Sequence, residues 1–251
     1  MPSSQNCWAQ LSEEAEYRGL DQMKAVAVIS GGLDSTTMLY LLRGKGYDVQ
    51  AISFDYGQRH RKELDFAQRA AARLGAPWAL VDLNAAGFTR FLTGSALTDQ
   101  QIAVPDGHYA DESMRSTVVP NRNAVMLSIA CSLATTCGAD AVAFGAHAGD
   151  HPIYPDCRPE FVDAFEAMER VALHGLADLK IMAPFLGTSK DGIVRLGAEL
   201  GVPFEETWSC YKGGDAHCGT CGTCFERREA FSLAGVPDPT RYLDNSVIFA
   251  A

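Results

Sequence analysis

The chain has 251 residues, of which 47% are hydrophobic and 21% charged, and its formal net charge is −10. This composition is typical of a soluble globular protein long enough to bury a full core. A broad phosphate-binding surface needs clustered lysine and arginine, so the acidic balance argues against direct binding of nucleic acid and favours small-molecule substrates. No apolar run reaches the roughly 18 residues of a membrane helix, and the N-terminus lacks a signal-peptide core. We therefore expect a cytoplasmic protein with no membrane partner.

Strand and helix patterns alternate along the first half of the chain. Residues 1–22 are expected to form an N-terminal extension. Apolar runs and helical spacing then predict a strand at 24–29, a helix to about residue 42, a strand at 47–54, a helix at 60–74 and a strand at 78–81. Residues 86–119 contain scattered glycine and proline, and we expect a long irregular loop over a cleft.

The same alternation continues in the second half. The pattern predicts a helix at 123–137, a strand at 140–144, and helices at 159–174 and 189–200. Alternation of this kind indicates a Rossmann-like α/β fold, with a parallel sheet covered by helices on both faces and ligands at the carboxyl ends of the strands. We expect an α/β domain at 23–205 and a small C-terminal region of different character at 206–251.

A glycine-rich loop follows the first predicted strand. Residues 30–35 read SGGLDS and stand between an apolar strand and a helix pattern. Gly31 and Gly32 permit positive φ and close approach to a ligand, and Ser30, Asp34 and Ser35 lie where a helix start leaves N–H groups unpaired. Such a helix start attracts phosphate. The alternative is a turn capped by serine and aspartate that binds nothing.

No Walker-type Gly-x-x-x-x-Gly-Lys-Ser/Thr and no Gly-x-Gly-x-x-Gly occurs in the chain. The SGGLDS loop instead resembles the pyrophosphate loop of the N-type ATP pyrophosphatases, the adenine nucleotide alpha-hydrolase type of fold. That resemblance implies cleavage of ATP between its α- and β-phosphates and activation of a substrate oxygen as an adenylate.

Four cysteines form a second motif near the C-terminus. Cys210, Cys218, Cys221 and Cys224 are spaced C-x7-C-x2-C-x2-C among glycines, a pattern that favours a structural Zn²⁺ site. An iron–sulfur cluster is the alternative, although the further cysteine followed by proline of the ferredoxin pattern is absent. We expect His217 to be an exposed residue that does not bind the metal.

The remaining cysteines are weaker signals. Cys131 and Cys137 fall in an apolar helix pattern and are expected in the core, whereas Cys7 lies in the extension and is expected to have no role. Cys157 stands in a polar loop, where a place beside the active site is one interpretation and a nucleophilic role is the less favoured one.

Further segments make the resemblance more specific. They are residues 54–60 (FDYGQRH), 118–123 (VVPNRN), 154–161 (YPDCRPEF), 207–211 (TWSCY) and 238–242 (DPTRY). With the loop and the cysteines, in this order and spacing, the chain from about residue 24 to 242 resembles the QueC family. The resemblance implies conversion of 7-carboxy-7-deazaguanine, ATP and ammonia into the nitrile 7-cyano-7-deazaguanine, a queuosine precursor, by a homodimer.

The resemblance also implies roles for individual residues. Ser30, Asp34 and Lys190 would be catalytic, with Asp34 helping to hold Mg²⁺. Arg122, Asn123, Tyr154, Asp156 and Arg158 are candidates for gripping the base and its carboxylate. The residues implied in ATP binding are Ile29, Ser30, Gly31, Gly32, Leu33, Asp34, Ser35, Thr36, Thr37, Met38 and Leu39.

The chain departs from the family pattern at three places. Leu33 stands where many members carry glutamine, and Asn121 replaces a glycine before the Arg-Asn pair, although asparagine tolerates the left-handed conformation. Residues 145–151 (GAHAGDH) are unusual for the family and leave open whether the group that receives the activated carboxylate is ammonia or something larger. Alternative functions are a deazaguanine ligase that stops at the amide or joins the carboxylate to a protein amine, a tRNA thiolase, and a zinc-stabilised nucleotide-sensing module.

Overall fold

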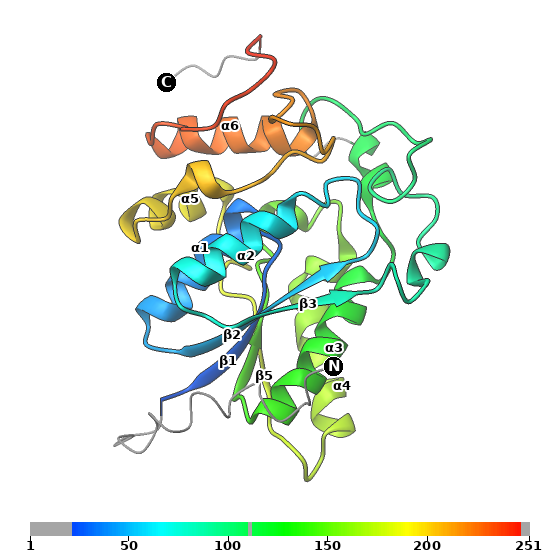
Figure 1. Cartoon of the computed structure of the whole chain (residues 1–251), viewed down its shortest axis with the longest axis vertical. Coiled ribbons are helices and arrows are strands. Elements are labelled where there is room, and N and C mark those ends of the chain that lie inside the picture. Colours follow the sequence, from blue (N-terminus) through cyan, green and yellow to red (C-terminus); the bar gives the residue numbers. More distant parts are fainter. Residues whose placement is uncertain (1–21, 110–111, 247–251) are drawn as a thin grey trace.

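Five parallel strands form a sheet in the order β3-β2-β1-β4-β5 in the computed structural model, which describes residues 22–109 and 112–246 (Figure 1). β1 pairs with β2 on one side and with β4 on the other. The strands are β1 (Lys24–Val28), β2 (Asp48–Asp55), β3 (Trp78–Asp82), β4 (Ala141–Ala143) and β5 (Lys180–Met182). The predicted parallel α/β fold is confirmed. Residues 1–21, including Cys7, lie outside the described residues.

Helices cover both faces of this sheet (Figure 1). They are α1 (Leu33–Gly44), α2 (Glu63–Arg73), α3 (Arg122–Cys137), α4 (Pro159–Ala172), α5 (Lys190–Glu199) and α6 (Gly222–Ala234). Short 3₁₀ helices lie in the connections: η3 (Phe88–Phe91), η4 (Glu112–Thr117), η5 (Ala148–Asp150), η6 (Pro155–Cys157) and η7 (Phe204–Glu206). No helix in the described ranges is long and apolar enough to cross a membrane.

Alternate residues of β1 face two different hydrophobic cores. Val26 belongs to the core shared with α3 and α4, whereas Ala27 belongs to the core shared with α1, α2, α5 and α6. This two-residue period is what a strand covered on both faces requires. Phe231 of α6 packs edge-on against Phe204 in the second core, with ring centroids 4.9 Å apart. The C-terminal region therefore shares a core with the α/β part, and its boundary at residue 206 stays a prediction.

Two elements were missed by the sequence analysis. β5 has three residues, too few for a periodic signal, and α6 begins inside the cysteine motif, whose glycines masked the helix pattern. The segment 86–119 is also more ordered than expected, since it contains η3 and η4 and contributes Leu97 and Met114 to the first core. The other predicted elements lie within a few residues of their observed positions.

Candidate functional site

The pocket opens where the strand order reverses. β1 and β4 are neighbours, and the helix after β1 (α1) packs on one face of the sheet whereas the helix after β4 (α4) packs on the other. In open parallel sheets this switch point, at the carboxyl ends of the strands, is where ligands bind. The loop after β1 and the segment after β4 both line the pocket. The fold therefore brings together two chain segments more than a hundred residues apart.

The loop after β1 depends on the absence of side chains at two glycines. Gly31 has φ +85°, and a Cβ there would collide with the carbonyl oxygen of Glu63. Gly145, after β4, is also tightly placed, because a Cβ would lie 3.1 Å from the backbone nitrogen of Ser35 and the backbone would have to shift slightly. Ser35 Oγ accepts a hydrogen bond from the backbone N–H of Ser30 at 3.2 Å. The first turn of α1 is thereby held open toward the pocket, where its unpaired N–H groups can receive an anion.

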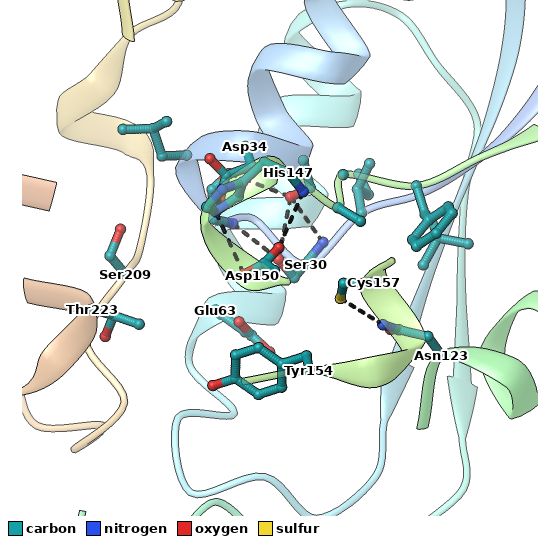
Figure 2. Close-up of a pocket in the computed structure, with 18 of the residues that line it drawn as sticks. Ser30, Asp34, Glu63, Asn123, His147, Asp150, Tyr154, Cys157, Ser209 and Thr223 are labelled. Carbon is teal, nitrogen blue, oxygen red and sulfur yellow. Dashed lines mark hydrogen bonds and ion pairs between the residues drawn. The ribbon is translucent and has the colours of Figure 1, made fainter. Parts of the chain in front are cut away.

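Charged and polar side chains meet directly beside this loop, at what we call the phosphate end of the pocket. Ser30, Asp34, His147, Asp150 and Lys190 line the pocket there, and the buried Glu226 lies behind them against Lys190. Lys190 Nζ donates to Asp34 Oδ2 at 2.7 Å and lies 3.2 Å from Glu226 Oε2. Figure 2 shows Asp34, His147, Asp150 and Ser30 converging on one another. Lys190 starts α5 and Glu226 belongs to α6, so three separate helices supply these charges.

The network tunes the charge state of its members. Burial raises the pKa of Asp34, but Lys190 and His147 together outweigh burial, and the net pKa is lowered. Burial lowers the pKa of Lys190, yet Asp34 and Glu226 raise it above its ordinary value. Burial raises the pKa of Glu226, against the opposing effect of Lys190 and His147. At neutral pH, Asp34 is therefore a carboxylate and Lys190 an ammonium group.

One carboxylate oxygen of Asp34 is available to bind a metal ion. Its Oδ1 atom is buried and has no hydrogen-bond partner among the described residues. A buried carboxylate oxygen without a partner is costly unless a ligand satisfies it. Hard oxygen donors of this kind suit Mg²⁺, which binds through one or two carboxylates together with phosphate oxygens. The residues present thus fit the divalent cation that ATP chemistry requires.

The side chains of the predicted ATP-binding stretch divide into two groups. Ile29, Ser30, Gly32, Leu33, Asp34 and Ser35 line the pocket. Gly31 supports the loop through its carbonyl, which accepts from Trp208 N at 2.9 Å. The side chains of Thr36, Thr37, Met38 and Leu39 are buried in α1 and do not line the pocket. Contact of those four residues with ATP stays a prediction.

Three residues of the phosphate end were missed by sequence reasoning. His147 and Asp150 belong to residues 145–151, which depart from the family pattern, and Glu226 belongs to α6, which the sequence analysis did not predict. His147 Nδ1 accepts from Gly149 N at 3.0 Å, and its Nε2 lies 3.3 Å from Lys190 Nζ and 3.5 Å from Asp150 Oδ1. His147 therefore orients the acidic side chains around Lys190. The signal available was the position of this segment directly after a buried strand.

Tyrosine side chains and one arginine form the other end of the pocket, which we call the base end. Tyr56, Tyr109, Tyr154 and Tyr211 line it together with Arg122. Arg122 Nη1 donates to Tyr56 Oη at 3.4 Å, and no carboxylate of the described residues lies within ion-pair distance of Arg122. Flat aromatic walls beside an arginine without an acidic partner suit a planar ring that carries a negative group.

The predicted substrate residues are only partly gathered at this end. Arg122, Asn123 and Tyr154 line the pocket. Asp156 instead accepts from Asn123 N at 3.0 Å and holds the start of α3. Arg158 is exposed, donates to the carbonyl of His151 at 2.8 Å and does not line the pocket. Direct contact of Asp156 or Arg158 with a substrate therefore has no support from the geometry and stays a prediction.

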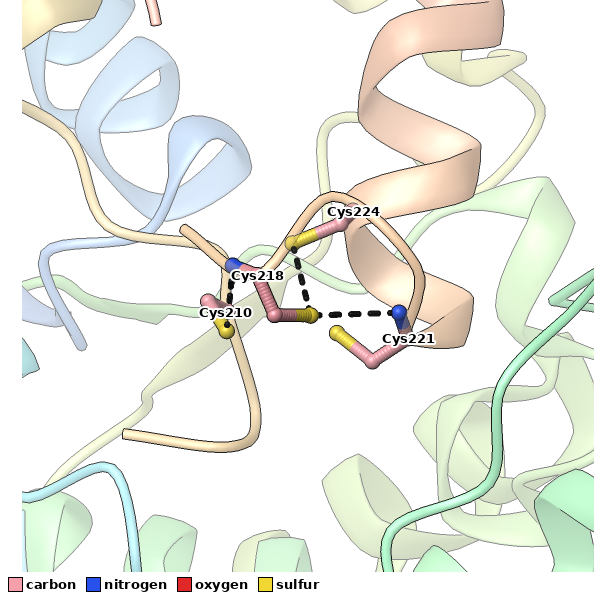
Figure 3. Close-up of side chains that lie close together, drawn as sticks. All are labelled: Cys210, Cys218, Cys221 and Cys224. Carbon is pink, nitrogen blue, oxygen red and sulfur yellow. Dashed lines mark hydrogen bonds between the residues drawn. The ribbon is translucent and has the colours of Figure 1, made fainter. Parts of the chain in front are cut away.

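The four cysteines of the C-terminal motif converge on one point (Figure 3). Their Sγ atoms all lie within 4.8 Å of one another, and Cys218 Sγ is 3.8 Å from Cys224 Sγ. A tetrahedral ion with Zn–S bonds of about 2.3 Å requires S–S separations of about 3.8 Å. An iron–sulfur cluster spreads its thiolates over two or more irons. The four sulfur atoms of the motif are therefore spaced for a single metal ion.

The neighbouring histidine is not a ligand, but it was wrongly expected to be exposed. His217 is buried, and its Nε2 accepts from Ser209 N at 3.0 Å. Burial lowers its pKa to about 3, so the ring is neutral. Ser209 itself lines the pocket (Figure 2). The hydrogen bond between His217 and Ser209 therefore connects the cysteine motif to the pocket wall.

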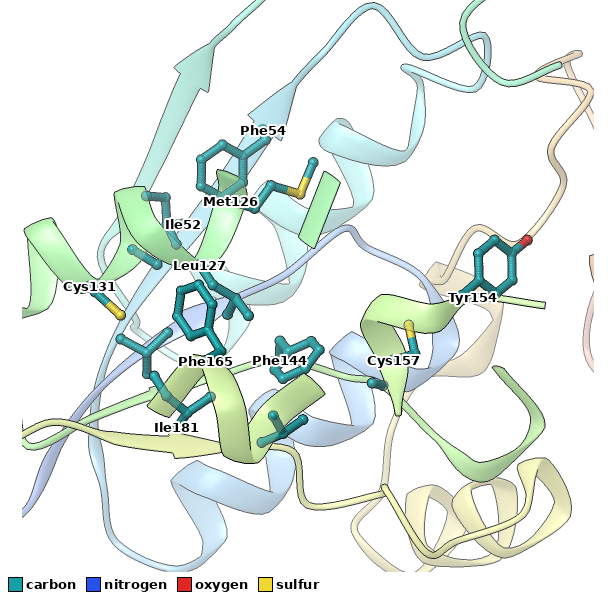
Figure 4. Close-up of a cluster of buried hydrophobic side chains, with 14 of the residues drawn as sticks. Ile52, Phe54, Met126, Leu127, Cys131, Phe144, Tyr154, Cys157, Phe165 and Ile181 are labelled. Atoms are coloured by element: carbon teal, nitrogen blue, oxygen red, sulfur yellow. The ribbon is translucent and has the colours of Figure 1, made fainter. Parts of the chain in front are cut away.

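The remaining thiols are buried. Cys131 packs in the first core and Cys137 is also buried, as predicted. Cys157 lies beside Tyr154 where that core meets the pocket (Figure 4), and it lines the pocket. Burial raises the pKa of its thiol well above the ordinary value, and Asn123 Nδ2 donates to its sulfur at 3.3 Å. A protonated thiol is a weak nucleophile, which disfavours a nucleophilic role.

Comparison with known proteins gives a consistent result. The family model "Queuosine biosynthesis protein QueC" matches residues 24–235. A protein named 7-cyano-7-deazaguanine synthase from Rhizobium johnstonii is 58% identical over 91% of this chain and 96% of its own length. One of the same name from a Ruegeria species is 59% identical over 88% of this chain and 94% of its own. The solved structure of NMN synthetase from Francisella tularensis covers 92% of this chain and 83% of its own at 15% identity, with a TM-score of 0.48, too low to support any conclusion.

Proposed function

The chain belongs to the QueC family of queuosine biosynthesis proteins, and we propose that it converts 7-carboxy-7-deazaguanine, ammonia and ATP into 7-cyano-7-deazaguanine. The family match and relatives of nearly 60% identity over almost their whole length support this reaction. The pocket is consistent with it, since it joins a phosphate-binding loop to an aromatic wall with a free arginine.

The chemistry removes both oxygens of a carboxylate, and each needs activation because neither is a good leaving group. In the first step a carboxylate oxygen attacks the α-phosphorus of ATP, and pyrophosphate leaves. Ammonia then displaces AMP to give the amide. In the second step the amide oxygen attacks a second ATP in the same way, and loss of AMP and a proton leaves the nitrile. The balance is two ATP and one ammonia per nitrile, with two AMP and two pyrophosphates released.

The phosphate end of the pocket supplies what these steps require. The N–H groups at the start of α1, with Ser30 and Ser35, would hold phosphate oxygens, and Lys190 would neutralise the departing pyrophosphate. Asp34 would hold Mg²⁺, which when bound offsets the negative charge of the phosphates. Arg122 at the base end would pair with the carboxylate and direct it toward the α-phosphorus.

One observation carries the proposal most directly. The contact of 2.7 Å between Lys190 Nζ and Asp34 Oδ2 brings a cation and an anion from two helices to the mouth of the loop after β1. A buried pair of this kind with a free Oδ1 on the acid is prepared for a polyphosphate and its cation. A sensor that only bound the nucleotide would not need Arg122 without an acidic partner in the same pocket.

The metal and the assembly are part of the proposal. We propose Zn²⁺ for Cys210, Cys218, Cys221 and Cys224, because four thiolates at tetrahedral spacing are typical of structural zinc. Reduced thiols at this site suit a cytoplasmic protein. We also propose a homodimer that acts on small molecules without direct nucleic acid contact, from the family resemblance and the net charge of −10. Zinc analysis of the purified protein tests the metal, and light scattering tests the dimer.

The reaction itself is tested by incubating the protein with ATP, Mg²⁺, ammonium and 7-carboxy-7-deazaguanine and identifying the products by mass spectrometry. We expect the nitrile to accumulate and the amide to appear transiently. Amide that accumulates without nitrile would favour the amide-forming ligase instead. No consumption of the base would overturn the proposed reaction.

A further inference from the structure

Two buried titratable side chains at the base end have no role in the reaction as described. Glu63 begins α2 and His60 lies in the turn before it, and both line the pocket. They are 8% and 3% exposed. Gln58 Nε2 donates to Glu63 Oε1 at 3.2 Å, and His60 Nε2 lies 3.5 Å from the same oxygen. Oε1 therefore accepts one hydrogen bond within the described residues and Oε2 none, and because a carboxylate oxygen can accept more than one, both can receive a donor from a ligand.

No lysine or arginine of the described residues lies within 4 Å of this carboxyl group, although Arg122 acts on it at longer range. The groups that face it are Gln58 and His60 from its own loop, Tyr56 from the end of β2 and Arg122 from α3. Burial raises the pKa of Glu63 to about 8, against smaller opposing effects from Gln58 and Arg122. Burial also lowers the pKa of His60 to about 3, so its ring is neutral. A carboxyl group kept at such cost in a pocket wall points to a ligand that satisfies it.

The neutral ring of His60 is fixed in one orientation. It packs against Tyr211 with ring centroids 5.1 Å apart, and its Nδ1 is buried without a partner among the described residues. A neutral imidazole carries one proton, and Nε2 is the nitrogen that faces the carboxyl group. His60 is thus placed to donate to Glu63 when the latter is ionised, which makes it a positioning residue for that carboxylate.

The proposed substrate presents the complementary groups. Along one side of 7-carboxy-7-deazaguanine the carboxylate is followed by the ring carbonyl oxygen, and then by the ring N–H and the 2-amino group. The first two are acceptors of hydrogen bonds and the last two are donors. The pocket wall carries complementary groups, since the donor Arg122 and the acceptor Glu63 both line it and are close enough for Arg122 to oppose the rise in the pKa of Glu63.

We propose that Glu63 determines which base is accepted, by receiving hydrogen bonds from the ring N–H and the 2-amino group. This inference rests on the proposed function and assigns the half of the base that Arg122 does not contact. Two N–H donors stabilise the ionised carboxyl group, so binding of the base draws a proton from Glu63. A base with a carbonyl oxygen in place of the 2-amino group presents an acceptor to this carboxylate and is rejected.

The test compares three carboxylated bases: the 2-amino base, its 2-oxo analogue and the analogue with hydrogen at that position. For the wild-type protein we expect kcat/KM for the 2-amino base to exceed that for the 2-oxo analogue by about 100-fold or more. In Glu63→Gln the side-chain amide can also donate to the 2-oxo group. The same ratio should then fall below about 10, mainly through a lower kcat/KM for the 2-amino base.

Glu169→Gln is the matched control. Glu169 is also a buried glutamate whose pKa is raised by burial, but it lies in α4 and does not line the pocket. This variant should keep the wild-type ratio. Glu63→Asp preserves the charge and should retain part of the discrimination, which provides a second reading if Glu63→Gln does not fold.

A wild-type ratio near one, or an unchanged ratio in Glu63→Gln, would overturn the assignment of Glu63 while leaving the proposed reaction intact. Failure of the wild-type protein to form nitrile from the 2-amino base would instead overturn the proposed reaction. In that case equilibrium binding of the three bases to the same variants still decides whether Glu63 discriminates among them.

Discussion

The two ends of the pocket hold their charges in opposite ways. At the phosphate end, Asp34, Lys190 and Glu226 are already in contact, with Lys190 Nζ within 3.2 Å of both acids. At the base end, Arg122 and Glu63 interact only at longer range, and neither forms an ion pair within 4 Å with a lysine, arginine or carboxylate of the described residues. Charged groups that are already in place can stabilise the charge that develops in the transition state. A buried charged group without a close partner instead favours ligands that supply the matching hydrogen-bonding group. Changes at the first end should therefore affect turnover, and changes at the second should affect substrate recognition.

Both ends of the pocket depend on the cysteine motif, and we expect the largest effect on stability from substitutions in that motif. Glu226 belongs to α6, which begins within the cysteine motif, and Tyr211 follows Cys210 directly. Because structural zinc contributes folding free energy of several kcal/mol, Cys221→Ser should lower the Tm by roughly 10 °C or more and reduce zinc from about one per chain.

Calorimetry and metal analysis check this result, with Cys137→Ser as the control, since Cys137 lies outside the motif and that variant should keep its zinc. A Cys221→Ser protein with unchanged Tm would mean that the motif does not support the pocket. Visible absorption near 400 nm in the wild-type protein would indicate an iron–sulfur cluster instead.

At the phosphate end, Asp34→Asn should lower kcat by about 10²–10³-fold, the effect of removing one organised electrostatic contact in an active site. Ser30→Ala should act in the same direction. Neither residue is a core side chain, so circular dichroism should be unchanged. Asp65→Asn, at an exposed position on α2, is the control for loss of one acidic charge. Steady-state rates for Asp34→Asn equal to those of the control would remove the loop from the mechanism.

The difference between the two ends also explains how far the sequence could predict the site. The loop at 30–35 and the four cysteines are local motifs, in which spacing along the chain sets the chemistry, and both were found. Glu63, His147 and Glu226 come from three different segments: Glu63 and His147 line the same pocket, and Glu226 of α6 lies 3.9 Å from His147 Nε2. No spacing rule connects residues 63, 147 and 226, so their convergence required the structure.

Exposure was the other property that the sequence did not determine. Arg122 and Arg158 both stand beside helix starts in motifs of the family, yet one lines the pocket and the other is exposed. Arg122 follows η4 along the chain and Arg158 directly follows η6, and these short helices carry no strong periodic signal in the sequence. The parallel sheet, by contrast, follows from apolar strands that alternate with helix patterns and was predicted correctly.

That pair of arginines sharpens the comparison at the base end. Arg122→Ala should raise the KM for the carboxylated base by about 10–150-fold with a smaller change in kcat, because a lost contact to a charged group costs about 1.5–3 kcal/mol. Arg158→Ala is the matched control and should change KM by less than about 2-fold. Steady-state kinetics at saturating ATP distinguish the two. Equal effects of both substitutions would contradict the assignment of Arg122 to the carboxylate.

The smallest effect concerns pH. Unfolded glutamate ionises near pH 4.5, whereas burial keeps Glu63 protonated up to a pKa of about 8 in the folded protein. The stability contributed by this shift is fully present below about pH 4.5 and is lost as pH rises through about 8. Relative to Glu63→Gln, the wild-type protein should lose about 1 kcal/mol of unfolding free energy between pH 7 and pH 8. Urea titrations at both values measure the difference, and a parallel pH dependence of the two proteins would argue against a buried neutral Glu63.

The central claim is that the two ends meet at the α-phosphorus of ATP, and oxygen labelling tests it most directly. The base is supplied with ¹⁸O in both carboxylate oxygens, and AMP, ADP, phosphate and pyrophosphate are analysed by mass spectrometry after conversion. We expect both labels to appear in AMP, one in each of two AMP molecules per nitrile, and none in pyrophosphate or inorganic phosphate. Label in inorganic phosphate, with ADP as the nucleotide product, would show attack at the γ-phosphorus and contradict the role assigned to the loop at residues 30–35.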